Sequence, residues 1–120
     1  MNKKTLVIGA SEKRSRYSNL AIHKLLKNNY EVLAIGLRNA EVNGIKISTE
    51  LQNYENIDTV TLYVSPKHQK VYYDYIVSLK PKRVIFNPGT ENSEFYKILE
   101  DNNINYEVAC TLTLLATDQY

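Results

Sequence analysis

The sequence has very little cysteine: Cys110 is the single thiol among 120 residues. One thiol cannot form an intramolecular disulfide, so a disulfide-stapled secreted fold is excluded and a reducing compartment is favoured. Long apolar runs are missing as well, and the residues before Thr5 carry no apolar signal region. From these absences we expect a soluble, cytoplasmic protein with no membrane contact.

A large excess of one charge is also missing. Lys and Arg total 15 against 13 Asp and Glu, which gives a net charge of +2. This charge is too small to attract nucleic acid without sequence specificity. Tryptophan is absent and tyrosine occurs ten times; we interpret the tyrosines as half-buried residues instead of an RNA-stacking surface. Neither His23 nor His68 has a second ligand at CxxC or HxxxH spacing. We therefore predict neither a nucleic-acid partner nor a metal site.

What remains is a composition typical of a globular domain, with 43% apolar and 23% charged residues. A chain of this length can bury one core. No repeat, linker or low-complexity stretch divides it, so we predict a single domain over residues 1–120. One Rossmann-type sheet uses most of this length and leaves little room for a substrate domain. A binding or regulatory role is therefore favoured over turnover.

Strands and helices are predicted to alternate along the whole chain. Short apolar runs predict five buried strands, at Thr5–Gly9, Glu31–Gly36, Asp58–Val64, Arg83–Phe86 and Tyr106–Ala109. Helical spacing predicts helices at Ser18–Asn28, between Pro66 and Pro81, at Glu91–Asn102 and at Thr111–Ala116. Strands joined by right-handed helical crossovers form a parallel sheet covered on both faces. We predict a Rossmann-like, doubly wound α/β/α domain with strand order 3-2-1-4-5.

Three finer expectations concern the helices and the connecting segments. Ser18 is expected to be the N-cap of the first helix, and residues 37–57 are expected to form a connection without regular structure. The helix after Pro66 is expected to bury its apolar face, which consists of Val71, Tyr75, Ile76 and Leu79. Tyr72 or Tyr73 is then expected to be exposed, as a weak indication of a homo-oligomer or partner surface.

A ligand site is predicted where the parallel strands end, at the point where strand order reverses. The segments expected at this rim are Gly9–Ser11, Gly36–Arg38, Ser65–Pro66, Asn87–Asn92 and Cys110. These segments are far apart in sequence, and the fold is expected to bring them together.

The first of these loops indicates an anion site. Gly9 allows close backbone approach, and the helix that follows presents N–H groups and a favourable dipole to an anion. Three cations occur next to it, Lys13, Arg14 and Arg16, against the single acid Glu12, which suits phosphate. The GxGxxG dinucleotide fingerprint is missing. The alternative interpretation is a solvated charged loop.

The second loop bears on the choice of cofactor. An NAD site places Asp or Glu near the end of the second strand, whereas this chain has Arg38 there. A cation favours a phosphorylated ribose, as in NADP or coenzyme A. Arg38 as an ordinary surface residue is the alternative.

Several motifs in order resemble the bacterial CoA-binding domain family. They are GAS-x-K-x-x-x-YS (Gly9–Ser18), NGIKI (Asn43–Ile47), YVSP (Tyr63–Pro66), NPGTEN (Asn87–Asn92) and Cys110, where the family commonly has a cysteine. The family comprises small stand-alone proteins similar to the nucleotide-binding domain of the succinyl-CoA synthetase α subunit. Family members often carry Asn-Pro after the second strand, where this chain has Gly36 and Leu37.

The resemblance implies a Rossmann-like domain that binds coenzyme A or an acyl-CoA, with no established catalytic activity of its own. By this analogy and from the rim as a whole, the expected cofactor-binding residues are Gly9, Ala10, Ser11, Lys13, Arg14, Arg16, Tyr17, Ser18, Arg38, Ser65, Pro66, His68, Asn87, Gly89, Thr90 and Glu91. Glu91 is expected to sit in a first helical turn and to order the Gly89–Thr90 turn, in preference to acting as a catalytic acid.

Cys110 allows two interpretations. Its thiolate could meet the thiol end of CoA and form a mixed disulfide or take an acyl group; alternatively, it is a small buried hydrophobic residue, since no histidine is near it in sequence. Three other functions stay open: an NADP-binding or NADP-sensing domain, a protein-interaction module that has lost its ligand, and a small acyl-transfer enzyme acting through Cys110.

Overall fold

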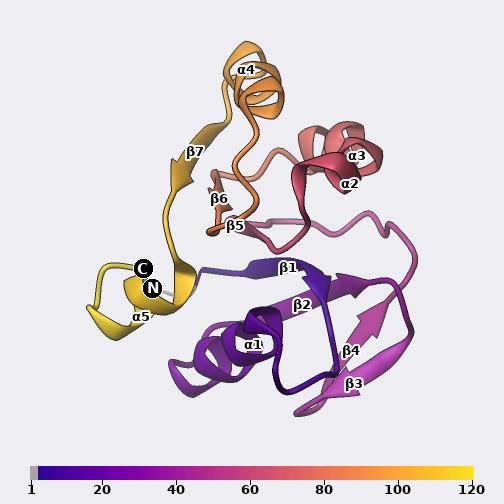
Figure 1. The fold of residues 1–120 in the computed structure, drawn as a ribbon, viewed down its shortest axis with the longest axis vertical. Helices are drawn as coiled ribbons and strands as arrows, with labels where there is room; N and C mark the ends of the chain where they lie inside the picture. Colours follow the sequence, from indigo (N-terminus) through magenta and orange to yellow (C-terminus); the bar gives the residue numbers. More distant parts are fainter. Residues whose placement is uncertain (1–2) are drawn as a thin grey trace.

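A seven-stranded, mostly parallel sheet forms the middle layer of the computed structural model, which describes residues 3–120 (Figure 1). Met1 and Asn2, part of the domain predicted over residues 1–120, lie outside the described residues. The strands are β1 (Thr5–Ala10), β2 (Val32–Gly36), β3 (Ala40–Val42), β4 (Ile45–Ser48), β5 (Thr59–Leu62), β6 (Arg83–Phe86) and β7 (Asn105–Val108). Their spatial order is β3-β4-β2-β1-β5-β6-β7.

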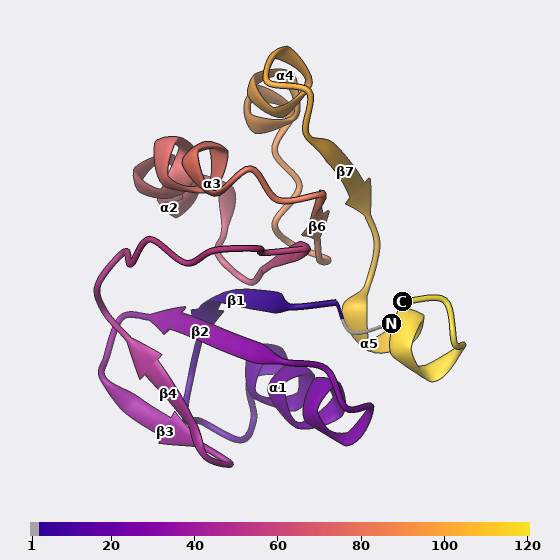
Figure 2. The same cartoon turned by 180° about the vertical axis from the view of Figure 1, so that it is seen from behind.

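Helices cover both faces of this sheet. They are α1 (Tyr17–Lys27), α2 (Pro66–Gln69), the 3₁₀ turn η1 (Lys70–Tyr72), α3 (Tyr73–Leu79), α4 (Ser93–Asp101) and α5 (Thr111–Ala116). Helices α1 and α5 lie on one side, and α2, α3 and α4 lie on the other (Figures 1 and 2). Within residues 3–120, no helix is long and apolar enough to cross a bilayer.

The predicted α/β class is confirmed, but the strand count of five and the order 3-2-1-4-5 are wrong. The segment predicted as third strand is β5, and it pairs with β1 (Leu6 with Val60) instead of lying beyond β2. The place beside β2 belongs to β4, where Ala34 pairs with Ile47. The six parallel strands therefore follow the order 3-2-1-4-5-6 of a complete Rossmann sheet, with β3 added antiparallel at one edge.

Residues 37–57, expected to be irregular, contain the β3–β4 hairpin. Asn43 and Gly44 form its two-residue turn with φ of 49° and 85°, as a type I′ turn requires. The two strands have only three and four residues, too few to show a clear alternation. Val42 and Ile47 nevertheless point inward and are buried, so tertiary packing completes these strands.

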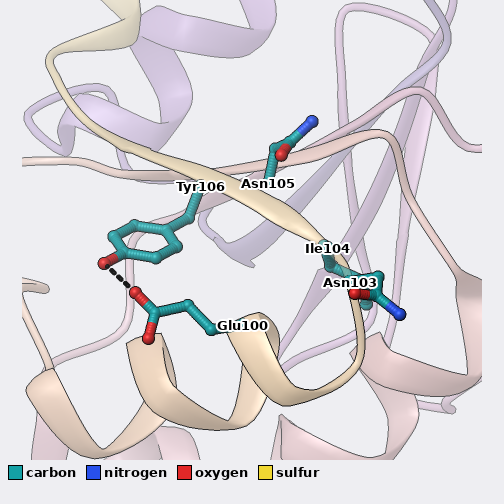
Figure 3. Close-up of a pocket in the computed structure, with 5 residues that line it drawn as sticks. All are labelled: Glu100, Asn103, Ile104, Asn105 and Tyr106. Atoms are coloured by element: carbon teal, nitrogen blue, oxygen red, sulfur yellow. Dashed lines mark hydrogen bonds between the residues drawn. The ribbon is translucent and has the colours of Figure 1, made fainter.

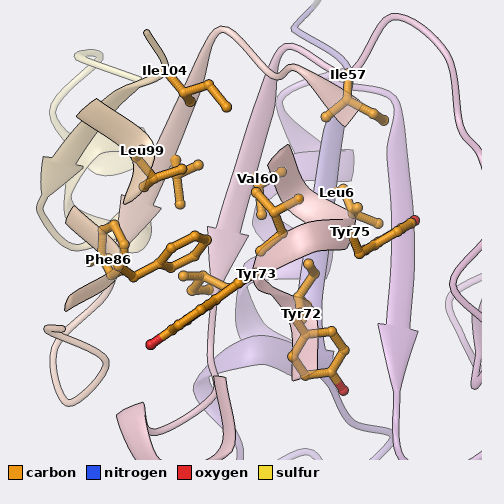
Figure 4. Close-up of a cluster of buried hydrophobic side chains, with 14 of the residues drawn as sticks. Leu6, Ile57, Val60, Tyr72, Tyr73, Tyr75, Phe86, Leu99 and Ile104 are labelled. Atoms are coloured by element: carbon orange, nitrogen blue, oxygen red, sulfur yellow. The ribbon is translucent and has the colours of Figure 1, made fainter. Parts of the chain in front are cut away.

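Alternate residues of β1 enter two separate cores. Leu6 and Ile8 join the cluster under α2–α4, together with the aromatic rings shown in Figure 4, whereas Val7 packs with Ile22 and Leu25 under α1. Both faces of the strand are thus buried, which explains why its sequence is an unbroken apolar run.

The segment between Pro66 and Pro81 corrects a predicted helical face. Val71, predicted to be buried, is 74% exposed, while Tyr72 and Tyr73, one of which was expected at the surface, are both buried. The cause is η1, because a 3₁₀ turn advances three residues per turn and shifts the phase of the buried face. Tyr75 and Ile76, beyond this turn, are buried as predicted.

Candidate cofactor-binding site

The carboxyl ends of β1 and β5 form the switch point of the sheet. From β1 the chain proceeds to β2 on one side and later returns to β5 on the other, and the loops that follow these strands are where a doubly wound sheet binds its ligands. The arrowheads of β1 and β2 lie on the same side in Figure 1. The Tyr63 N–H donates to the Ile8 carbonyl (2.8 Å), so the two loops separate only beyond this bond.

Glycine is required at two positions of this rim. Gly9 has φ of +91°, and a Cβ added there would lie 2.6 Å from the Tyr63 carbonyl oxygen. A Cβ on Gly36 would lie 2.3 Å from the Ala10 carbonyl oxygen. Since backbone atoms occupy these positions, no other residue fits without displacing a strand.

The loop after β1 is held by its own hydrogen bonds. The side-chain amide of Asn19, a buried residue, donates to the Ser11 carbonyl (3.0 Å). The Lys13 N–H donates to Ser11 Oγ (3.1 Å), and the Arg16 N–H donates to the Lys13 carbonyl (3.1 Å). The sequence did not single out Asn19; an amide on the inner face of an amphipathic helix is the signal that could have revealed it.

Helix α1 begins with an uncapped, positively charged end. Arg16 is its N-cap and makes no side-chain capping bond, and the first turn holds no acid. Ser18, predicted to be the cap, is instead a buried first-turn residue, because the turn from Lys13 to Arg16 starts the helix earlier. The first N–H groups of a helix have no partners within the helix, so together with the dipole they favour an anion here.

The cations of the rim are free of acidic partners. Lys13, Arg14, Arg16 and Arg38 are all exposed, and none of the salt bridges within residues 3–120 engages them. Pairing of Ala10 with Gly36 sets the residues that follow the two strands side by side.

Two large apolar side chains are exposed at the same end of the sheet. Tyr17, the first residue of α1, is 71% exposed, and Leu37, directly after β2, is 90% exposed. Together with the free cations they give this part of the rim both charged and apolar surface, as a nucleotide requires.

The loop after β6 is organised by the buried side chain of Asn87. Its amide donates to Thr61 Oγ1 (2.7 Å) and to the Leu62 carbonyl (2.8 Å), and its oxygen accepts from the Thr111 N–H (2.8 Å). Asn87 therefore ties β5, β6 and the start of α5 together. Its side chain is fully engaged within the protein, whereas the neighbouring Gly89 lies exposed at the surface.

Glu91 orders the turn next to Asn87, as predicted, but the prediction that it sits in a first helical turn is wrong, because α4 has its N-cap at Asn92 and begins at Ser93. Its carboxylate accepts from the Gly89 N–H (2.9 Å), where Gly89 has φ of +91°. The Thr90 hydroxyl donates to the Asn87 carbonyl (2.7 Å) and is buried. The turn is thus fixed by side chains on both sides of its glycine.

A buried amide network that the sequence did not reveal joins the loops after β5 and β6. Gln69, in α2, donates to the carbonyls of Val64 (2.8 Å) and Thr90 (2.6 Å). Asn92 donates to Gln69 Oε1 (3.0 Å) and to the Tyr73 hydroxyl (2.6 Å), and its own oxygen caps α4. These bonds hold the two loops in one arrangement. Ser65, Pro66 and His68, by contrast, are exposed, with Pro66 in the first turn of α2 as predicted.

Cys110 is the half-buried N-cap residue of α5. Partial burial raises the pKa of its thiol, but the nearby Thr113 hydroxyl and the Thr113 and Leu112 N–H groups favour the thiolate, outweigh burial and lower the pKa below its usual value. Nearby, burial raises the pKa of Tyr63 to about 12, although the Thr111 and Thr61 hydroxyls partly offset it. Those hydroxyls bond to each other (2.8 Å), and the buried Tyr63 hydroxyl near them has no hydrogen-bond partner among residues 3–120.

Other surface features lie away from the rim. One depression, lined by Lys4, Asp58 and Lys82 among others, lies at the amino ends of the strands, and a second one lies between α4 and β7. No group of three or more His, Cys, Asp or Glu side chains within residues 3–120 could hold a metal ion.

Comparison with known proteins gives both sequence and structural matches. A family model described as "CoA binding domain" matches residues 3–116. A crystal structure described as an uncharacterized protein is 45% identical, with a TM-score of 0.97 and coverage of 100% of this chain and 99% of the other. A hypothetical protein from Pyrococcus horikoshii OT3 is 30% identical, with a TM-score of 0.84 and coverage of 93% and 80%.

A further structure, from Thermus thermophilus, shares the fold at 22% identity, with a TM-score of 0.84 and coverage of 98% of this chain and 91% of that one. Among curated proteins, no sequence matches this chain.

Proposed function

Since the chain belongs to the CoA binding domain family, we propose that it binds coenzyme A or an acyl-CoA across the carboxyl rim of its sheet, as a binding or regulatory module without turnover. The site comprises the loops after β1, β2, β5 and β6. In this proposal the cofactor-binding residues are those predicted from the sequence, except that the buried side chains of Asn87, Ser18 and Thr90 position the rim.

The uncapped end of α1 is the observation that carries the proposal. Helix N–H groups, a turn held open by Gly9, and the unpaired cations Lys13, Arg14 and Arg16 converge on one loop. A diphosphate supplies the acceptors and the negative charge that these groups lack. Because Asn19 already fixes the loop, little ordering entropy is lost on binding.

The loop after β2 supports a phosphorylated adenosine. Arg38 is exposed and forms no salt bridge within residues 3–120, which suits a ribose phosphate. The exposed side chains of Tyr17 and Leu37 would lose water-accessible apolar surface against an adenine ring or a pantetheine chain. NADP also carries a ribose phosphate, so the choice between the two cofactors rests on the family and is decided by experiment.

The surroundings of Cys110 support binding in preference to catalysis. Its neighbours include Tyr63, whose pKa of about 12 keeps the phenol neutral at physiological pH, and the hydroxyl of Thr113. None of these groups is a general base near neutral pH. Glu91, the acid of the neighbouring turn, is engaged with the Gly89 N–H.

Isothermal calorimetry and thermal unfolding with CoA, acetyl-CoA, NADP and NAD test the proposal. We expect CoA or acetyl-CoA to bind most tightly, and at 100 times its Kd to add about 2.7 kcal/mol to the free energy of unfolding. The triple variant Lys13→Ala, Arg14→Ala, Arg16→Ala should lose at least about tenfold in affinity, because it removes three charge-assisted contacts.

The matched control is Lys24→Ala, Lys27→Ala, Lys97→Ala, which removes the same charge from exposed positions away from the rim. It should bind CoA nearly as wild type does. Tighter binding of NADP than of CoA would assign the site to NADP, and failure of every nucleotide to bind would leave a protein-interaction module.

A further inference from the structure

Strand β7 leaves one side of the sheet open. It is the terminal strand, and within residues 3–120 no strand pairs with its outer side; Figures 1 and 2 show no element beyond it. The opposite edge, β3, has only three residues and carries the charged residue Glu41, which lies opposite Lys46 of β4. Short, charged edges are how proteins prevent strand addition. β7 is longer and leaves Val108 57% exposed.

The direction of the main-chain groups of β7 follows from its parallel ladder. The Ala109 N–H donates to the Phe86 carbonyl (3.1 Å), toward β6. In a parallel ladder the N–H and C=O of alternate residues point to the same side, so Asn105 and Glu107 also bond inward. The N–H and C=O groups of Tyr106 and Val108 therefore point outward, as does the Ile104 carbonyl, and within residues 3–120 no strand pairs with them. The Ile104 N–H is already engaged, because it donates to the Leu99 carbonyl (2.9 Å).

Side chains on both faces hold this edge in place. Tyr106 stacks on Tyr96 of α4 (centroids 4.5 Å apart), and its hydroxyl donates to Glu100 (2.9 Å; Figure 3). On the other face Arg83 forms an ion pair with Glu107 (2.9 Å). A strand held this way is already ordered, so pairing costs little conformational entropy.

We propose that β7 pairs antiparallel with β7 of a second copy of this chain, with Tyr106 opposite Tyr106 on the two-fold axis. Opposite residues of an antiparallel pair share a face, so the possible registers differ by steps of two along the chain. In this register Ile104 lies opposite Val108, and Asn105 lies opposite Glu107, to which its amide can donate. In this register an apolar side chain therefore faces an apolar one, and a hydrogen-bond donor faces an acceptor.

The neighbouring registers are less favourable. Moving the axis to Glu107 sets two like charges opposite each other, which is destabilising. Moving it to Asn105 leaves Val108 without an apolar partner. Because strand pairing is antiparallel, the two carboxyl rims point to opposite ends of the joined sheet, so the dimer neither covers nor requires the proposed cofactor site.

Sedimentation over a range of protein concentrations tests the dimer. We expect the mass of the wild type to rise from monomer to dimer below about 1 mM. Val108→Lys should weaken association at least about tenfold, because it desolvates an ammonium group against Ile104 of the second copy. The control Val71→Lys makes the same change at an exposed valine of η1, away from β7. This variant should associate as the wild type does.

Cysteine cross-linking tests the register in a Cys110→Ser background. An Asn105→Cys chain mixed with a Glu107→Cys chain should form a disulfide dimer with oxidised glutathione, since directly opposite residues without mutual hydrogen bonds lie about 4.5 Å apart at Cα. Each chain alone should cross-link poorly. A monomer at every concentration, or equal association of the Val108→Lys and wild-type chains, would overturn the dimer; cross-linking of Glu107→Cys with itself would overturn the register.

Discussion

Tyr63 and Tyr75 show how two similar residues differ in what their hydroxyl groups contribute. Burial is the main cause that raises the pKa of each phenol to about 12. The Tyr75 hydroxyl donates to the Gln52 carbonyl (2.6 Å), whereas the buried Tyr63 hydroxyl finds no hydrogen-bond partner in the described part of the chain. Burying an unpaired hydroxyl costs desolvation free energy, and no hydrogen bond in the folded protein compensates for this cost.

We expect Tyr63→Phe to keep or raise the free energy of unfolding at pH 7, and Tyr75→Phe to lower it by about 1 kcal/mol.

Both native phenols stay neutral to about pH 12, while those of the unfolded chain ionise near pH 10.0. Ionisation of these phenols therefore leaves the free energy of unfolding unchanged below pH 10 and lowers it as pH rises from 10 to 12. Either variant should flatten this loss in urea titrations. A marked loss for Tyr63→Phe at pH 7 would show that its hydroxyl has a stabilising bond.

At the scale of single elements, strand β1 ends in a bulge that shapes the site. The register with β2 shifts between Ile8 and Ala10, and Gly9 takes φ of +91° directly against the Tyr63 carbonyl. Gly89 has the same φ, but nothing lies within 4 Å of where its Cβ would be. Substitutions at these two glycines therefore distinguish the cost of a positive φ alone, at Gly89, from the added cost of steric contact, at Gly9.

We expect Gly89→Ala to cost about 1 kcal/mol, the strain of a positive φ alone. Gly9→Ala should cost at least about 3 kcal/mol, because backbone atoms of Tyr63, directly after β5, must also move. Urea unfolding of both variants measures the difference. Equal losses would mean that the close approach of β1 to β5 relaxes without cost.

The elements also show where prediction from sequence succeeds. Helix α4 was placed correctly because Phe95 and Leu99 repeat at helical spacing and are buried. The buried face after Pro66 was misassigned because a 3₁₀ turn at Lys70–Tyr72 breaks the 3.6-residue period. Hairpin β3–β4 was missed because its strands are too short for periodicity, although Asn43 and Gly44 carried the turn signal.

At the scale of the whole molecule, charge is distributed unevenly although the net charge is only +2. The rim after β1 and β2 exposes four cations, Lys13, Arg14, Arg16 and Arg38, free of salt bridges within the described residues. A polyanionic ligand would therefore be attracted by a local field that the overall composition conceals.

We expect the Kd for CoA to rise about tenfold between 0.05 and 0.5 M salt, because screening shortens the range of this field. Dephospho-CoA, which lacks the ribose phosphate, should show a shallower dependence, and Arg38→Ala should make the two ligands alike. Calorimetry at several salt concentrations measures both slopes. An affinity that does not change with salt would place the ligand away from these cations.

By itself, the sequence determined the α/β class, the parallel core and the glycine-led basic loop, because these depend on local apolar runs and on residues adjacent in the chain. Only the tertiary structure decided that β5 lies beside β1, that Asn87 and Gln69 tie the rim together, and that β7 has a free edge. Those features depend on pairings between segments far apart in the chain, where strand order is set by the packing of the whole sheet.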